Sequence, residues 1–414
     1  MRKINLSRRD FVMQSLVATA ALSARQGTAA EAQTPAVSTP PALPITHKIK
    51  VGIVGGGHRG NLIGGFMKSH GGFEIHAVTD YFPETADALG ETFGVNKARR
   101  FSGLSGYKKT IDSGIDALVI MDVPCFYPEQ AKAAVDADLH VYMAKPFAVD
   151  VPGCLLQLET AKRATAKKRC VLVDYQIPLD KANKEVAKRI HEGGVEGLSH
   201  ICSGGQSSVW GDPAKGKTIE NLLRGGVWLS SVNLGGDNIV SYDIHIIDGV
   251  TWIMGKRPIT ACGFSKITRP NPQGDRTDCG SVTYHYDDGT IWSHVTQALA
   301  NNAWMHNLGA DFMGCNATAT INYWGKSQIR GGPKHVVGSA SNNIYNDGAE
   351  ANVAEFYRCI IEEKYDNPTA FRAVDGTLTA ILGREAMARR GLVRMEDLLR
   401  ENRKLELDLS GLKA

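Results

Sequence analysis

The chain has 414 residues, which is more than one hydrophobic core usually holds, so two domains are expected. Its hydrophobic fraction of 43% and charged fraction of 22% are typical of a soluble globular protein. The formal net charge is +4, but residues 1–32 contain five Lys or Arg and only two acidic residues. The rest of the chain is therefore nearly neutral, which argues against nucleic acid or an acidic membrane surface as a partner.

Residues 1–32 resemble a bacterial twin-arginine export signal. Ser7-Arg8-Arg9-Asp10-Phe11 precedes a moderately apolar, alanine-rich run, and Ala30-Glu31-Ala32 offers a small-x-small cleavage site. The run is too short and too weakly apolar to predict a membrane span, so none is expected in the mature protein. Residues 33–47 then form a Pro-rich linker. A basic, disordered N-terminus is the alternative interpretation.

Export of this kind would place the protein in the periplasm or outside the cell. The resemblance also implies that the chain folds before export, often with its cofactor already bound. Because no cytoplasmic pool could then replace a lost cofactor, slow cofactor release is expected.

A β-branched run at residues 48–54 leads directly into a glycine-rich turn and a helical pattern at residues 61–69. The residues of this turn are Gly55, Gly57, His58, Arg59 and Gly60. The spacing Gly-x-Gly-x-x-Gly predicts a dinucleotide site, because it permits a sharp turn, leaves room for a pyrophosphate and lets the helix pack closely on the strand. The phosphates would meet the free N–H groups at the helix N-terminus. Glycine triplets also occur in ordinary surface loops.

Asp80 ends the next β-rich run, twenty positions after Gly60. A carboxylate at this place can accept hydrogen bonds from the adenosine ribose, and it would repel a 2′-phosphate. The sequence therefore predicts NAD as the cofactor, with NADP less favoured. An ordinary βαβ unit with an acidic strand end is the alternative.

Strand and helix patterns alternate up to residue 174. Further strands are indicated at 116–121, 139–143 and 171–177, and helices at 83–93, 129–137 and from 150 onward. This alternation predicts an NAD-binding Rossmann domain over residues 48–174, with a doubly wound parallel sheet whose ligand lies beyond the carboxyl ends of the strands. Val123, Pro124 and Lys145 follow such strand ends.

Residues 175–414 predict a second domain of the α+β type, for substrate binding and oligomerisation. An amphipathic helix at 181–192 is followed by consecutive strand patterns, which imply a large, mostly antiparallel sheet. The expected strands are 198–203, 258–264, 279–286, 291–297, 307–313 and 317–323. The expected helices are 239–254, 352–363, 375–390 and 395–402, and residues 404–414 are expected to form a surface arm.

The glycine turn, Asp80, Val123-Pro124 and Ala144-Lys145-Pro146 together resemble the Gfo/Idh/MocA family of NAD(P)-dependent sugar oxidoreductases. The resemblance extends from about residue 48 to the C-terminal helices. It implies that Lys145 is catalytic and also touches the cofactor. The family usually has Glu-Lys-Pro where this chain has Ala144 before Lys145, and its Thr-Pro-Asn is here Val123-Pro124-Cys125.

The same resemblance selects residues of the predicted helix 239–254. His245 matches the family's histidine and Asp248 the acid three residues later, whereas Ser241 stands where the family often has an aspartate. His245 is therefore predicted to be catalytic, with a pKa suited to acid–base work. Ser241 and Asp248 are candidates to contact the substrate or orient the helix. A lone histidine on a helix is otherwise more often a core residue.

Three further residues are candidates to contact the substrate. Tyr175 and Gln176 lie where the family's strand end faces the nicotinamide and substrate, and Trp228 lies in a long connection at residues 203–233. Core packing explains these aromatic residues equally well.

The eight cysteines contain no Cys-x-x-Cys, and the histidines form no readable ligand set, so no metal is predicted and the cysteines are expected to be free thiols. The leading hypothesis is an exported NAD(P)-dependent oxidoreductase that acts on a carbohydrate or polyol hydroxyl. A redox-neutral, NAD-dependent glycosidase or lyase working by oxidation and elimination is the second. A non-catalytic sugar-binding protein is the third. A homo-oligomer is expected from the family alone.

Overall fold

The computed structural model describes residues 45–207, 212, 218–299, 308–338 and 343–414. All of them belong to one compact unit, residues 37–414. The predicted export signal and most of the Pro-rich linker lie outside the described residues.

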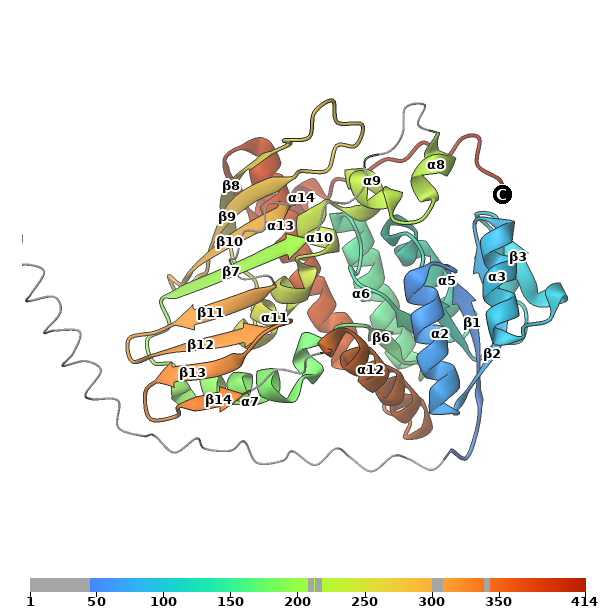
Figure 1. Cartoon of the computed structure of the whole chain (residues 1–414), viewed down its shortest axis with the longest axis horizontal. Helices are drawn as coiled ribbons and strands as arrows, with labels where there is room; N and C mark the ends of the chain where they lie inside the picture. The colour runs from blue at the N-terminus through green and yellow to red at the C-terminus, as the bar shows by residue number, and fades with distance from the viewer. Residues whose placement is uncertain (1–44, 208–211, 213–217, 300–307, 339–342) are drawn as a thin grey trace, which may run out of the picture. The chain divides into compact units, whose positions relative to one another are not determined.

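The first half of this unit is a parallel sheet with the order β3-β2-β1-β4-β5-β6 (Figure 1). Its strands are β1 (Ile49–Val54), β2 (Phe73–Asp80), β3 (Arg100–Ser102), β4 (Ala117–Ile120), β5 (His140–Met143) and β6 (Val171–Val173). The accompanying helices are α2 (His58–His70), α3 (Pro83–Phe93), α4 (Gly106–Ile111), α5 (Tyr127–Asp136) and α6 (Val151–Ala166), with short turns η1 (Lys97–Arg99), η2 (Pro124–Phe126) and η3 (Ile177–Leu179). The strands β4, β5 and β6 are wholly buried, as expected of a sheet covered on both faces.

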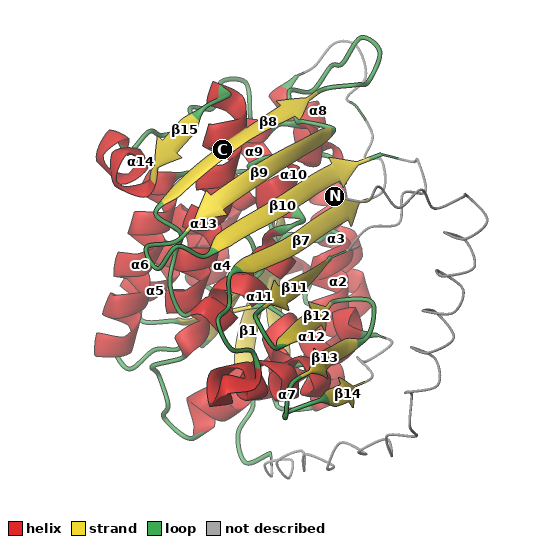
Figure 2. Cartoon of the chain, turned by 90° about the vertical axis from the view of Figure 1, so that its left-hand side faces the viewer, coloured by secondary structure: helices red, strands yellow, loops and turns green. Residues whose placement is uncertain are grey.

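The second half contains a nine-stranded sheet with the order β14-β13-β12-β11-β7-β10-β9-β8-β15. In Figure 2 this sheet faces the viewer and the helices lie behind it. Its strands are β7 (His200–Ser207), β8 (Thr260–Lys266), β9 (Cys279–His285), β10 (Ile291–Ala298), β11 (Gly309–Met313), β12 (Ala317–Asn322), β13 (Ser327–Gly331), β14 (Val336–Gly338) and β15 (Leu392–Arg394). Among the described strand pairs of this second sheet, only β7–β10 is parallel. The predicted fold class, a parallel sheet followed by a large, mostly antiparallel one, is therefore confirmed.

The helices of the second half connect the two sheets. They are α7 (Lys181–Arg189), α8 (Ile219–Leu223), α9 (Val232–Gly235), α10 (Asn238–Ser241), α11 (Ile244–Met254), α12 (Ile344–Ile361), α13 (Pro368–Arg389) and α14 (Met395–Glu401), with η4 (Ile190–Gly194) and η5 (Val227–Ser230) as irregular turns. The helix α13 packs on β8 and α11 of one half and on α6 of the other, and α12 packs on α2. Both halves therefore share one continuous core.

The main differences from the sequence prediction concern three helices. The helix α12 begins at Ile344, not at residue 352. The helix α13 begins at Pro368, not at 375, because Asn367 caps it: the Asn367 side chain accepts a hydrogen bond from the Thr369 N–H at 3.0 Å, and Pro368 fits the first helical position. The predicted helix 239–254 is instead two helices, α10 and α11, with a break at Tyr242 and Asp243.

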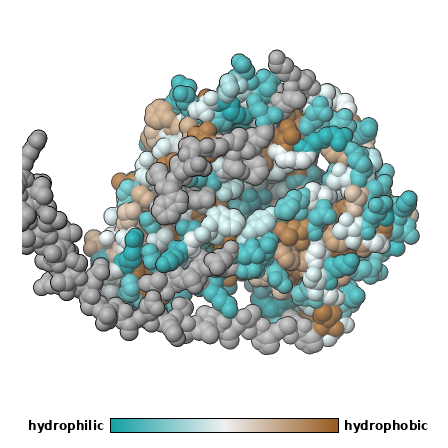
Figure 3. Space-filling view, in the orientation of Figure 1, coloured by the Kyte–Doolittle hydropathy of each residue, from teal (hydrophilic) through white to brown (hydrophobic). Residues whose placement is uncertain are grey.

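Polar and apolar side chains are unevenly distributed over the surface. On the face seen in Figure 3, hydrophilic side chains predominate and apolar ones form small separate areas. The nine-stranded sheet, in contrast, exposes large apolar side chains on β8, β10 and β15, namely Phe264, Ile291 and Leu392.

The glycine turn gives a test of the fold. A Cβ on Gly60 would overlap the Gly55 carbonyl oxygen, so the backbone would have to shift. We expect Gly60→Ala to lower the free energy of unfolding by about 1–3 kcal/mol. The matched control is Gly65→Ala in the same helix, where a Cβ meets nothing within 4 Å. This control should stabilise the protein by about 0.5–1 kcal/mol. Urea unfolding of both variants measures the difference, and equal stability would contradict the packing described.

Candidate active site

The glycine turn leaves the N-terminus of α2 open. Gly55 has a φ of +96°, and a side chain there would overlap the Met121 backbone oxygen. A Cβ on Gly57 would meet no atom within 4 Å, and no side chain caps α2 at this position. The first N–H groups of α2 are therefore accessible to an anion, and the turn fits a pyrophosphate. His58, the first residue of α2, has its ring 6.4 Å from the Tyr345 ring.

Asp80 lies beside the same turn and is held by the backbone. Its Oδ2 accepts a hydrogen bond from the Gly56 N–H at 2.8 Å, and its Oδ1 accepts one from the Phe82 N–H at 2.9 Å. Burial raises the pKa of Asp80, and the two N–H groups oppose this shift. The carboxylate is thus fixed at the end of β2, where an adenosine ribose binds in Rossmann domains.

A cleft of about 200 Å³ lies next to Asp80, and we call it the Asp80 cleft. Its lining includes Asp80, Tyr107, Val123, Phe126, Leu223 and Leu409. Pro124, which begins η2, is buried directly after Val123. The cleft also contains Asp122, whose pKa burial raises to about 6 although the Gln130 side chain donates to it at 2.6 Å. Mostly apolar walls with a few carboxylates suit an adenosine.

Lys145 follows β5 and is mostly buried. Its Nζ donates to the backbone carbonyl of Ser241, the last residue of α10, at 2.5 Å. Burial and the positive charge of Arg59 lower the pKa of Lys145 to about 7, while Asp174 and Asp243 act in the opposite direction. Near neutral pH a large share of this amine is uncharged and able to accept a proton.

His245 is buried in the first turn of α11. Its ring centroid is 4.8 Å from that of Tyr323, and its Nδ1 has no hydrogen-bond partner among the residues that the structure describes. Burial, Lys145 and Arg59 together lower the pKa of His245, so the imidazole is neutral near pH 7. Lys145 contacts the carbonyl of Ser241, four residues before His245, so the structure places these two predicted residues near each other.

Arg59 does not point into the Asp80 cleft but pairs with the buried Asp174, directly after β6. Asp174 Oδ1 also accepts hydrogen bonds from the Gln176 Nε2 at 2.9 Å and the Asn352 Nδ2 at 2.8 Å. Gln176 Oε1 in turn accepts one from the Tyr323 hydroxyl at 3.0 Å. A polar chain therefore runs from the glycine turn to the ring that contacts His245.

Sequence reasoning missed Asp174, Tyr323 and Asn352 in this chain of contacts. The available signal was the arginine in the turn. If Arg59 is buried, its charge needs a buried carboxylate as a partner. No spacing in the sequence identifies the partner, since Asp174 lies 115 residues away from Arg59.

The other candidate residues have mostly structural contacts. Tyr175 is buried and its ring lies 5.7 Å from the Arg372 guanidinium. Asp248 Oδ1 accepts a hydrogen bond from the Arg372 Nε at 2.8 Å, which ties α11 to α13 and leaves His245 without this carboxylate. Ser241 contributes its backbone carbonyl to Lys145. Trp228, in η5, packs on an apolar cluster that includes Phe82 and Val123.

The break between α10 and α11 is stabilised by Asp243. Its Oδ2 pairs with the buried His294 Nε2 at 3.0 Å, and His294 Nδ1 is 2.8 Å from the Ser203 hydroxyl. The Oδ1 of Asp243 accepts a hydrogen bond from the Asn238 Nδ2 at 3.3 Å. Because the Asp243 side chain is committed to these contacts, the chain turns here and exposes the Ser241 carbonyl to Lys145.

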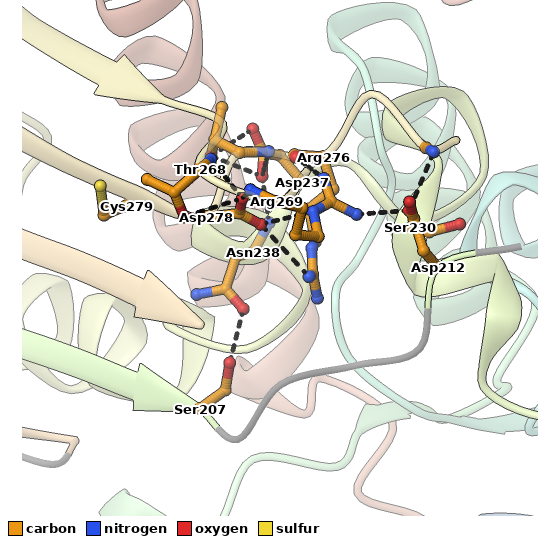
Figure 4. A network of polar contacts seen from close by, with 12 residues as sticks. Ser207, Asp212, Ser230, Asp237, Asn238, Thr268, Arg269, Arg276, Asp278 and Cys279 are labelled. Atoms are coloured by element: carbon orange, nitrogen blue, oxygen red, sulfur yellow. Dashed lines mark hydrogen bonds and ion pairs between the residues drawn. The ribbon is translucent and has the colours of Figure 1, made fainter. Parts of the chain in front are cut away.

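The start of α10 is fixed by a second polar network (Figure 4). The Asp237 carboxylate accepts hydrogen bonds from the Asn238 N–H at 2.6 Å and from the Thr277 hydroxyl at 2.9 Å. The Ser207 hydroxyl, at the end of β7, donates to Asn238 Oδ1 at 3.0 Å. Burial raises the pKa of Asp237 to about 6 against these donors. The loop before α10 is therefore held from both sides.

Within the described ranges, no group of three or more His, Cys, Asp and Glu side chains is arranged to hold a metal ion. The eight cysteines are free thiols. Among the helices that the structure describes, none is both long and apolar enough to cross a bilayer.

Residues 49–175 match the sequence model of GFO_IDH_MocA, described as an oxidoreductase family with an NAD-binding Rossmann fold. No curated protein matches the chain.

Solved structures with a similar fold cover most of the chain. Myo-inositol 2-dehydrogenase from Lactobacillus plantarum has a TM-score of 0.66 at 18% identity, over 84% of this chain and 99% of its own. Aldose-aldose oxidoreductase from Caulobacter crescentus, complexed with glycerol, has a TM-score of 0.66 at 15% identity, over 84% and 100%. Levoglucosan dehydrogenase, in complex with NADH and levoglucosan, has a TM-score of 0.68 at 15% identity, over 84% and 100%. Residues 49–175 thus match the Gfo/Idh/MocA oxidoreductase family, and 84% of the chain shares the fold of these solved structures.

Proposed function

We propose that this chain is an NAD-dependent oxidoreductase that acts on a hydroxyl group of a carbohydrate or related polyol. The observation that carries the proposal is Lys145, a mostly buried amine with a pKa of about 7 at the carboxyl edge of the Rossmann sheet. The family match of residues 49–175 and the fold shared with sugar and inositol dehydrogenases support the substrate class.

The roles of the residues follow from their geometry. Bound NAD would supply the acceptor for the hydride that leaves the substrate carbon. Lys145, in its neutral form, takes the proton of the reacting hydroxyl. His245 is neutral and its Nδ1 is unpartnered in the described part of the chain, so it can hold the same hydroxyl or a neighbouring one by a hydrogen bond. Asp174 holds Arg59 in a mostly buried ion pair, and the positive charge of Arg59 opposes protonation of Lys145.

The preference for NAD over NADP belongs to this proposal and rests on Asp80. Its carboxylate would repel a 2′-phosphate, and its two backbone N–H donors keep it at the ribose position. We also propose a homo-oligomer, which is supported by the exposed Phe264, Ile291 and Leu392 on the nine-stranded sheet.

A redox-neutral, NAD-dependent cleavage of glycosides is the second candidate. Such a cycle needs two proton acceptors, one for a hydroxyl and one for the neighbouring carbon. The Nδ1 of the neutral His245 has no hydrogen-bond partner among the described residues, so His245 offers the second proton acceptor beside Lys145. Net oxidation accumulates reduced nicotinamide, whereas the redox-neutral cycle releases a sugar without it, so absorbance at the nicotinamide band distinguishes the two.

Cofactor binding is tested at Gly57. A Cβ there meets no protein atom and would instead occupy the space left for the pyrophosphate. Gly57→Ala should therefore fold with wild-type stability and weaken NAD binding at least about tenfold, which corresponds to about 1.4 kcal/mol. Isothermal titration of the wild type, this variant and the Gly65→Ala control with NAD and NADP measures the effect. Wild-type affinity in Gly57→Ala, or tighter binding of NADP than of NAD, would contradict the assignment.

The catalytic role is tested at Lys145. In the wild type, kcat/KM for oxidation should rise with pH and level off above about 7, because the neutral amine is the active form. Lys145→Met should lower kcat by about 10²–10⁴-fold, and Lys145→Arg should remove the inflection near pH 7. Lys132→Met on the exposed side of α5, where Lys132 pairs with Asp136 at 2.6 Å, is the matched control. An unchanged activity of Lys145→Met would contradict the catalytic role of Lys145, and a wild type that binds NAD without any turnover of sugars or polyols would support the non-catalytic alternative.

We propose that the protein is exported by the twin-arginine route and holds its cofactor tightly. The arginine pair Arg8-Arg9 supports this proposal. The double substitution Arg8→Lys and Arg9→Lys should leave the full-length precursor in the cytoplasm. The matched control is Arg2→Lys, which lies outside the pair and should not affect export. Cell fractionation and immunoblotting measure the distribution, and equal export of the wild type and both variants would contradict the route.

A further inference from the structure

The segment after α14, residues 404–413, lies on the nucleotide-binding half, and we call it the strap (Figure 1). The Leu405 N–H donates to Asp150 Oδ2 at 2.9 Å, and the Glu406 carbonyl accepts from Asn233 Nδ2 at 2.8 Å. Near its other end, the Lys413 carbonyl accepts from the Leu104 N–H at 3.0 Å. The strap is therefore tied to loops that follow β5 and β3, and to α9 between these attachments.

The side chains of the strap alternate between two environments. Every second residue from Lys404 to Ser410 is exposed, whereas the leucines between them are partly buried. The leucines are Leu405, Leu407, Leu409 and, after a glycine, Leu412. Alternation of this kind indicates a segment with one face fixed against the protein. Leu407 and Leu412 pack on the cluster of Phe82, Val123, Leu223 and Leu234, and Leu409 lines the Asp80 cleft.

Tyr81 connects the strap to α8, a helix that also borders the Asp80 cleft. It follows Asp80 directly, its hydroxyl accepts a hydrogen bond from the Lys413 N–H at 3.1 Å, and the same hydroxyl donates to Glu220 Oε1 of α8 at 3.2 Å. The helix α8 is further held by Arg224, which pairs with Glu84 at 3.0 Å and lies 3.9 Å above the Phe82 ring. Strap and α8 thus meet at the residue next to the predicted ribose carboxylate.

We propose that the strap is part of the cofactor site and retains the adenosine half of NAD in the Asp80 cleft. This inference rests on the proposed function. Leu409 from the strap and Leu223 from α8 complete the walls of a cleft whose remaining walls come from the strands, helices and loops of the Rossmann half. An adenosine bound there is enclosed by a segment attached through a few hydrogen bonds and leucine contacts, so its release requires the strap to detach first. Cofactor dissociation is then limited by strap opening.

The experiment measures dissociation of NADH from the full-length mature protein. The protein is loaded with NADH, mixed with excess NAD in a stopped-flow instrument, and followed by nicotinamide fluorescence. Leu409→Ala should raise the dissociation rate about tenfold, and deletion of residues 406–414 should raise it about a hundredfold. Leu399→Ala in α14 is the matched control, because Leu399 is also a partly buried leucine but packs on the main core, outside the strap and the cleft. Its rate should stay within twofold of the wild type.

A second readout is the amount of NAD released from purified, denatured protein, measured by mass spectrometry. It should fall in Leu409→Ala and in the deletion but not in Leu399→Ala. If circular dichroism shows that the deletion variant does not fold, Leu409→Ala alone decides the test. Dissociation rates within twofold of the wild type in a folded Leu409→Ala variant, or equal increases in Leu409→Ala and Leu399→Ala, would overturn the inference. Failure of the wild type to bind NADH would overturn the proposed function itself, and the strap assignment with it.

Discussion

The hydrogen bond from Lys145 to the Ser241 carbonyl is the contact on which the site depends. It joins a loop of the Rossmann sheet to a helix end of the second half. The acceptor is a neutral carbonyl, and burial together with the charge of Arg59 outweighs the attraction of Asp174 and Asp243, so the pKa of Lys145 falls to about 7. A salt bridge at the same place would have kept the lysine charged. The end of α10 therefore determines which group Lys145 contacts.

The position of that helix end is determined by buried contacts that do not involve the Lys145 side chain. Asp237 and Asn238 fix the start of α10, and Asp243 with His294 fixes its end. In the Rossmann half, Asp174 pairs with Arg59 and accepts hydrogen bonds from Gln176 and Asn352, so it connects the glycine turn to α12. The two halves of the protein thus hold the candidate catalytic residues from opposite sides. The networks that do so contain the buried carboxylates of Asp174, Asp237 and Asp243, which all have partners.

The parallel sheet, the glycine turn and Asp80 could be predicted from the sequence because their signals are local. Strand and helix periods alternate, and the glycines and the carboxylate lie within one βαβ unit. The break at Tyr242 could not be predicted, since the pattern of residues 239–254 is helical throughout and the cause is the contact of Asp243 with His294, 51 residues away. For the same reason Asp248 looked like a neighbour of His245 but pairs with Arg372, 124 residues away. The strap was predicted only as a surface arm, because its leucines contact residues far away in the sequence, in the Asp80 cleft and the adjoining apolar cluster.

The hydrogen bonds of Asp80 have a consequence for redesign of cofactor specificity. The carboxylate that would discriminate against a phosphorylated ribose also closes the glycine turn through the Gly56 N–H and starts the next loop through the Phe82 N–H. Exchanging it for a small neutral residue to admit the larger dinucleotide would leave two amides without acceptors. Selectivity and loop geometry are thus encoded by one side chain, and a switch of coenzyme would need compensating substitutions in the loops that Asp80 now holds.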